Sequence, residues 1–229
     1  MVHMRPSLYL EKARTIEIID LKPFLTLVAL IGWCTLAKSQ RKVWLALGIH
    51  LLVVTVIEIS AFVEAYNGRH NLWIYNSYLT VQMPLLVWLV TSIAGSRLLQ
   101  RVAVFFIVPS CVVLIADLHG LDFQEEMMVP TALVNCVLLS ALFTWVLFDL
   151  AQHAADPLLR SARFWIAFAH LLFFGCTIPL TGLFNYLMER DLELAEKLYV
   201  LNDIPYALHY GILTWALFRT TRSRTLVGT

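Results

Sequence analysis

Polar side chains within long apolar segments are the residues of this sequence that could do chemistry. Insertion of an acid at the centre of a membrane helix costs roughly 2.5–3.5 kcal/mol, so such residues usually face the bundle interior and mark function. Their types, one or two acids among amides, phenols and an imidazole, suit hydrogen bonding to a small polar ligand in an uncharged-to-acidic cavity. The predicted ligand-binding residues are Glu58, Tyr75, Asn76, Gln82, Asn135, Asn202, Asp203, Tyr206 and His209.

The stretch from Asn202 to Tyr206 is the most informative of these segments. Pro205 cannot donate a backbone N–H, so it disturbs the preceding turn and frees carbonyl groups beside Asn202. Broken helices at membrane depth are tolerated where they line a cavity. The alternative interpretation is structural, because Asn and Gln also bond across helix bundles and hold them together. The sequence leaves both interpretations open.

His50 and His170 each lie about two turns from one end of an apolar segment. Two imidazoles could ligate a haem iron or another metal axially. No further His, Cys or acid is expected at their depth, however, and neutral histidine bonded to a neighbouring helix is the commoner case. We therefore expect no cofactor and no metal. The cysteines show no close pairing typical of a metal or redox site, and we interpret them as small buried residues: Cys34, Cys111, Cys136 and Cys176.

Long apolar helices must position these side chains. Of the 229 residues, 59% are hydrophobic and 14% are charged, against about 25% charge in a soluble domain. A span needs about 20 mainly apolar residues. The sequence predicts an all-α membrane protein with a seven-helix transmembrane domain over residues 23–218, a leader over 1–22 that is an interfacial helix or an ordered tail, and a tail over 219–229. The predicted spans are 23–38, 43–66, 72–94, 100–118, 128–150, 163–187 and 198–218.

Basic residues predict the orientation of these spans. Outside the leader, ten Lys and Arg residues fall on one side of the predicted membrane and three on the other. The side richer in basic residues is usually cytoplasmic, although the leader's own basic residues favour the opposite orientation. We predict an inner-membrane protein of a bacterium with its N-terminus outside and its C-terminus in the cytoplasm. The two sets are Lys38, Arg41, Lys42, Arg97, Arg101, Arg160, Arg163, Arg219, Arg222 and Arg224, against Arg69, Arg190 and Lys197.

Two pairs of segments are similar within the chain. The run from Trp44 to His50 matches that from Trp165 to His170, and the run from Leu72 to Asn76 matches that from Leu198 to Asn202, at offsets of 120 and 126. The matches predict two parallel three-helix repeats, 23–94 and 128–218, joined by a linker helix over 100–118. This arrangement resembles the architecture of SWEET-type sugar carriers. The proline pattern of that family is not evident, so the resemblance is one of architecture.

A second resemblance rests on Glu58, on the run Asn71-Leu72-Trp73 and on Tyr78. It is to a group of uncharacterised bacterial seven-helix membrane proteins, and it covers most of the chain by length and span count. Gln82 stands where that group is expected to have an acid. The group has no established activity, so the resemblance implies no catalytic residues.

Several classes of function are disfavoured. A retinal protein needs a lysine within a helix, and no predicted span has one in its middle. Membrane zinc hydrolases related to ceramidases need several ligands, whereas the last predicted helix has only His209. A hydrolase or a haem protein is therefore a minor alternative, and we do not expect an enzyme.

Two functions remain. The first is a receptor-like or accessory sensing role, in which a small polar ligand fills an outward-facing cavity and a cytoplasmic or membrane partner transmits the signal. The alternative is a SWEET-like carrier of a small neutral solute. Polar residues are sparse in the predicted cytoplasmic half, which favours the first. The lipid bilayer is an expected partner, and nucleic acid is not.

Overall fold

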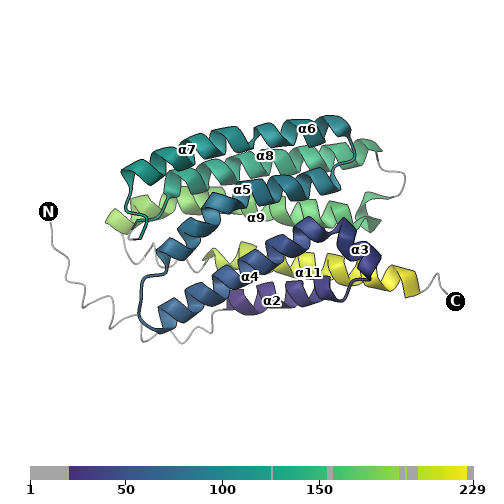
Figure 1. Ribbon diagram of the computed structural model, residues 1–229, viewed down its shortest axis with the longest axis horizontal. Helices are drawn as coiled ribbons and strands as arrows, with labels where there is room; N and C mark the ends of the chain where they lie inside the picture. The colour runs from purple at the N-terminus through teal and green to yellow at the C-terminus, as the bar shows by residue number, and fades with distance from the viewer. Residues whose placement is uncertain (1–20, 125, 154–156, 191–193, 195–200, 226–229) are drawn as a thin grey trace.

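The computed structural model describes residues 21–124, 126–153, 157–190, 194 and 201–225. This part of the chain is all-helical and has no strand, as Figure 1 shows. The prediction of an all-α protein is confirmed. The predicted leader lies largely outside the described residues, but its last two residues belong to a helix, because α2 already includes Leu21 and Lys22.

Each predicted span overlaps a helix, and the predicted linker overlaps two. The helices are α2 (Leu21–Cys34), α3 (Lys38–Val43), α4 (Leu45–Tyr66), α5 (Leu72–Ile93), α6 (Arg97–Phe105), α7 (Ile107–Gly120), α8 (Val129–His153), α9 (Ala162–Arg190) and α11 (Asp203–Thr225), with a short 3₁₀ turn, η2 (Leu158–Arg160), before α9.

Four of these helical segments are long and apolar enough to cross a membrane: Leu45–Tyr66, Arg97–Gly120, Val129–His153 and Ala162–Leu183. The described part of α2 has 14 residues, which is about 21 Å of helix. Helices α5 and α11 are as long as the four but less apolar, because they carry polar side chains such as Gln82 and His209. The structure is thus that of a helical protein compatible with a membrane, in which the count of seven spans stays a prediction.

The segment predicted as a linker helix is interrupted at Phe106, between α6 and α7. Pro109 explains the interruption. Its nitrogen has no hydrogen for the carbonyl of Phe105 four residues earlier, and its ring crowds that carbonyl. The start of α6 is capped by Ser96, whose hydroxyl oxygen accepts from the Leu99 N–H at 3.3 Å.

Six helices form a closed ring in the order α2, α4, α5, α8, α9, α11, with α11 returning to contact α2. The pair α6 and α7 packs on α5 and α8 from outside this ring, and Figure 1 shows it along one edge of the bundle. The outward faces are apolar: Val108 and Val112 on α7 and Phe148 on α8 are more than half exposed. Such faces are typical of helices that contact lipid.

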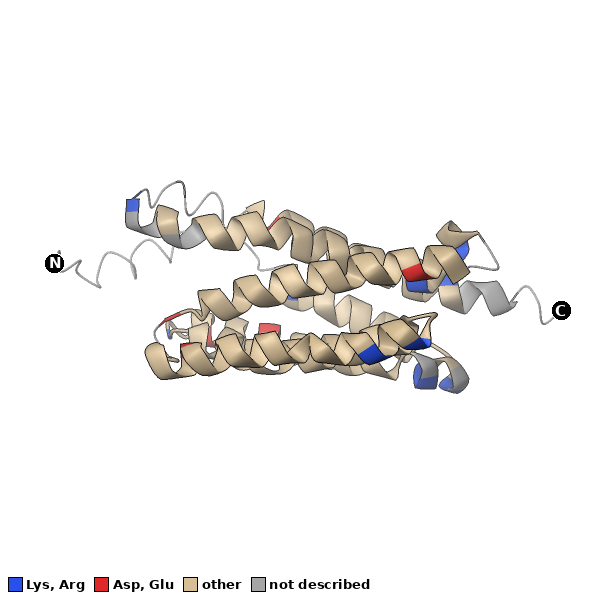
Figure 2. Cartoon of the chain, turned by 90° about the horizontal axis from the view of Figure 1, so that it is seen from above, with Lys and Arg blue, Asp and Glu red and all other residues tan. Residues whose placement is uncertain are grey.

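The two ends of the bundle differ in charge, as Figure 2 shows. Most described basic side chains lie at the end where the C-terminus lies, which we call the basic end: Lys38, Arg41, Lys42, Arg97, Arg101, Arg160, Arg163 and Arg219. The loops 67–71 and 121–128 lie at the other end, which we call the opposite end. Toward the basic end the ring interior is filled by fully buried apolar side chains, among them Leu47, Leu89, Ile93, Val146 and Leu213.

Candidate functional site

A cavity of about 350 Å³ lies inside the helix ring. Its lining comes from the parts of α2, α4, α5, α8, α9 and α11 that are nearest the opposite end. The lining residues are Lys22, Val54, Ile57, Glu58, Asn71, Leu72, Tyr75, Tyr78, Leu79, Gln82, Met127, Val129, Ala132, Cys136, Phe173, Phe174, Thr177, Leu180, Thr181, Asn202, Tyr206 and Tyr210. Five of the predicted ligand-binding residues are among them: Glu58, Tyr75, Gln82, Asn202 and Tyr206.

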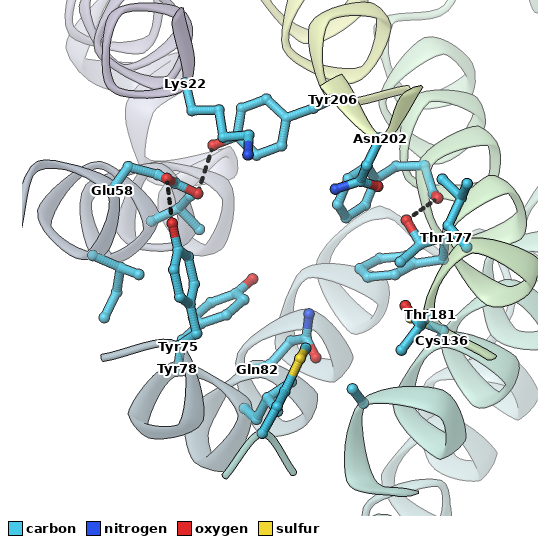
Figure 3. Close-up of a pocket in the computed structure, with 18 of the residues that line it drawn as sticks. Lys22, Glu58, Tyr75, Tyr78, Gln82, Cys136, Thr177, Thr181, Asn202 and Tyr206 are labelled. Carbon is cyan, nitrogen blue, oxygen red and sulfur yellow. Dashed lines mark hydrogen bonds between the residues drawn. The ribbon is translucent and has the colours of Figure 1, made fainter. Parts of the chain in front are cut away.

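Glu58 connects three helices at one side of the cavity. Its Oε2 accepts from the Tyr75 hydroxyl of α5 at 3.3 Å, and its Oε1 accepts from the Tyr206 hydroxyl of α11 at 3.0 Å. The residue is only 6% exposed, so its carboxylate depends on these donors in place of water. Figure 3 shows the two tyrosines meeting Glu58 from different directions.

Lys22 lines the same side of the cavity, although the sequence placed it in the leader. Its Nζ is 3.2 Å from Oδ1 of Asp203 and 5.8 Å from the centre of the Tyr206 ring. Asp203 itself lies outside the lining, at the start of α11. The ion pair therefore connects the first turns of α2 and α11, which run side by side in the same direction.

Asn202 lies where the helical backbone is interrupted. The residue has a turn conformation between helical Leu201 and Asp203, three residues before Pro205, as expected from the missing proline N–H. Its carbonyl accepts from the Tyr206 N–H at 3.3 Å. The side-chain Oδ1 is buried and has no hydrogen-bond partner among the described residues, and Figure 3 shows this side chain at the cavity.

Asn135 supports the cavity wall without lining it. Its Nδ2 donates to Gln82 Oε1 at 3.2 Å, and its Oδ1 accepts from the Ser110 hydroxyl at 2.6 Å. The chain of bonds fixes the Gln82 amide from behind and holds α7 against α5 and α8. Here the two interpretations of the sequence, ligand site and helix contact, apply to adjacent residues.

Asn76 lies outside the cavity lining, and its amide bonds to the loop before α8. The Nδ2 donates to the carbonyl oxygens of Phe123 at 2.9 Å and Glu126 at 2.8 Å, and Oδ1 accepts from the Met128 N–H at 3.1 Å. The side chain is fully buried. Asn76 and Asn202, predicted to be equivalent, thus have different surroundings.

His209 lies below the cavity in a cluster with His50 and His170. Ring centres are 4.6 Å apart for His209 and His170, and 5.6 Å apart for His170 and His50. The expectation that no third histidine shares this depth is therefore wrong, because α11 and α9 pack so that His209 meets His170. Phe143 stacks on His170 at 4.7 Å between ring centres. With the rings in contact, no porphyrin plane fits between His50 and His170.

Five ring nitrogens of this cluster have no hydrogen-bond partner among the described residues: both of His50, both of His209 and Nε2 of His170. Nδ1 of His170 contacts the Ile166 carbonyl at 2.8 Å. Among the described residues, no group of three or more His, Cys, Asp and Glu side chains has an arrangement that could hold a metal ion. The cluster is an apolar, aromatic floor beneath the cavity.

Several lining residues were not predicted from the sequence. Helical periodicity could have found two of them, because Tyr78 lies one turn from Tyr75, and Tyr210 lies one turn from Tyr206, on the same faces. Nothing in the sequence pattern points to Lys22. Two further buried acids bond to backbone instead of the cavity: Asp117 accepts from the Thr131 N–H at 2.9 Å, and Asp149 from the Gly95 N–H at 2.6 Å.

The fold and site define a helical bundle compatible with a membrane, with a largely apolar cavity that has charged and hydroxyl groups at one side. Comparison of the chain with protein families, curated proteins and solved structures finds no match.

Proposed function

We propose that this chain is an integral membrane protein of seven spans that binds a small amphipathic molecule in the cavity and has a receptor-like or accessory role. The one-sided position of the cavity carries this proposal. Its lining belongs to the half of the ring nearest the opposite end, whereas the other half is filled by buried side chains such as Leu47 and Ile93. Such a site suits binding from one side, with the signal transmitted through a cytoplasmic or membrane partner.

The cavity walls support an amphipathic ligand in place of the small polar ligand expected from the sequence. Apolar and aromatic side chains such as Ile57, Leu79 and Phe173 form most of the wall, and charged groups lie at one side with Glu58 and Lys22. Apolar walls with a few polar groups are the usual form of a small-molecule site, in which the polar groups orient the ligand.

The position of every helix in the ring supports seven spans. Helices α2, α5 and α11 alternate in this ring with helices that meet the length and apolarity of a span, so they cross the hydrocarbon region with them. The bonds from Glu58 to Tyr75 and Tyr206 satisfy polar groups inside the bundle, as the bilayer requires. The gathering of basic residues near the C-terminus supports a cytoplasmic C-terminus.

A carrier of a small neutral solute is the second candidate. The ring order α2, α4, α5, α8, α9, α11 is the order that two parallel repeats would produce. Six helices following one another around a ring have these neighbours without a repeat as well. The different surroundings of Asn76 and Asn202 and the closed half of the ring place this candidate second.

The test combines thermal-shift screening of small amphipathic and polar compounds with uptake into proteoliposomes. We expect stabilisation by an amphipathic compound without uptake. Ala132→Trp, which fills the cavity from α8, should abolish the shift, whereas Ala116→Trp on the exposed face of α7 should preserve it. Uptake of a stabilising compound would instead make the protein a carrier. Equal shifts in both variants would remove the cavity as the binding site.

A further inference from the structure

The polar side of the cavity combines an excess of negative charge with aromatic rings. Two carboxylates, Glu58 and Asp203, and one ammonium group, Lys22, meet there among the described residues. Their sum is one negative charge when all three are ionised. Inside a bundle with few charges and little water, a group of opposite charge is attracted far more strongly than in bulk water.

Aromatic rings surround this carboxylate. Tyr75 and Tyr206 donate their hydroxyls to Glu58, which places both rings beside it. Tyr210 packs on Tyr206 with ring centres 4.7 Å apart, and Phe173 meets Tyr206 edge to face at 6.1 Å. Cations are attracted to the faces of such rings, and groups of aromatic rings recognise quaternary ammonium ions.

Lys22 already uses both kinds of contact. Its ammonium group pairs with Asp203 at 3.2 Å and lies 5.8 Å from the centre of the Tyr206 ring, and Figure 3 shows it beside Tyr206 and close to Glu58. The protein therefore holds a cation of its own at this side of the cavity, at the end of a flexible four-carbon stem.

We propose that the cavity recognises an organic ammonium ion with an apolar body, and that Lys22 is an internal cation competing for the same carboxylate and aromatic groups. This inference rests on the proposed function, because it names the ligand class of the same cavity. The ammonium head lies between Glu58 and the rings of Tyr75 and Tyr206. The apolar body extends along Leu79 and Phe173 toward the middle of the bundle.

The test uses three soluble compounds that share one aromatic body and differ in head charge: benzyltrimethylammonium, phenylacetamide and phenylacetate. Each is titrated into the purified full-length protein by calorimetry. We expect the ammonium compound to bind at least about tenfold more tightly than the amide, since a desolvated cation–π contact with a nearby carboxylate is worth that much. Phenylacetate should bind most weakly, because it meets two carboxylates.

Two substitutions should act in opposite directions. Glu58→Gln keeps an oxygen for the tyrosine hydroxyls but removes the charge, so the preference for the ammonium compound over the amide should fall about tenfold. Lys22→Met removes the competing cation and should raise the affinity for the ammonium compound severalfold. The matched controls are Glu64→Gln, on the same helix but outside the lining, and Lys38→Met at the basic end; neither should change the preference.

Equal binding of all three compounds, or a lower ammonium affinity in Lys22→Met, overturns the ammonium inference and leaves the proposed amphipathic site standing. Binding of none of them overturns the inference as well, and the proteoliposome and thermal-shift experiment then decides the proposed function separately. Should Glu58→Gln not fold, Tyr206→Phe and Lys22→Met test the same geometry, because Tyr206→Phe keeps the ring while freeing the carboxylate for a cation.

Discussion

Glu58 holds its carboxylate between the hydroxyls of Tyr75 and Tyr206, and this arrangement connects α4 to α5 and α11. The same groups both stabilise the bundle and form the polar side of the cavity. A buried acid with two phenolic donors keeps its lone pairs satisfied when no ligand is present. A ligand head then exchanges one set of partners for another, so its binding depends on the difference between them.

The two asparagines provide a prediction at this scale. Asn202→Ala removes an amide whose Oδ1 has no described partner, so ligand affinity should fall about threefold to tenfold while stability changes little. Asn76→Ala leaves two carbonyls and one N–H of the loop before α8 without their partner. It should lower stability by about 1–3 kcal/mol without changing affinity. Denaturation midpoints and titration of the stabilising compound check both.

An equal loss of affinity in the two asparagine variants would contradict this assignment. It would favour the equivalence predicted from the internal repeat, in which both amides hold the solute.

At the scale of helices, close approach between α2 and α4 depends on one small residue. A Cβ built on Gly48 would overlap the indole ring of Trp33. That ring cannot move freely, because its Nε1 donates to the Trp44 carbonyl at 2.9 Å. Small residues at membrane helix contacts allow this kind of packing. Since α2 supplies Lys22, the Gly48 contact also positions one charged group of the cavity.

Gly48→Ala should therefore destabilise the protein by about 1–3 kcal/mol, the usual effect of excess volume in a packed core. Gly175→Ala on α9 is the matched control, because nothing lies within 4 Å of its added Cβ, and alanine is the better helix former. Thermal or denaturant unfolding of both variants measures the difference. Similar stability of the two would show that α2 can shift away from α4 at no cost.

At the scale of the molecule, charge and cavity are placed at opposite ends of the ring. The basic residues lie near the C-terminus, and the cavity lining lies nearer the loops 67–71 and 121–128. If the basic end is cytoplasmic, as such a bias usually indicates, the cavity is in the outer half of the membrane. A ligand from outside the cell would then reach Glu58 without crossing the packed half.

Cysteine labelling tests this orientation. In a variant without the four native cysteines, Gln124→Cys in the exposed loop at the opposite end should react with a membrane-impermeant maleimide in intact spheroplasts. Arg160→Cys, exposed at the basic end, should react only after the membrane is opened. The reverse pattern would invert the orientation and place the cavity on the cytoplasmic side.

The sequence by itself determined the helical class, because long apolar segments can satisfy their backbone in lipid only as helices. It also located much of the cavity. Glu58, Gln82 and Tyr206 are costly to expose to lipid, so their position inside the bundle follows from residue type.

Only the tertiary structure decided which polar groups meet. Helix rotation and depth are set by packing, such as the contact of Trp33 with Gly48, and a single chain does not encode them as a readable pattern. That packing brings Lys22 into the cavity and His209 onto His170, and it directs Asn76 to the loop before α8. Each outcome depends on neighbours far along the chain, and for that reason residue type and spacing did not reveal them.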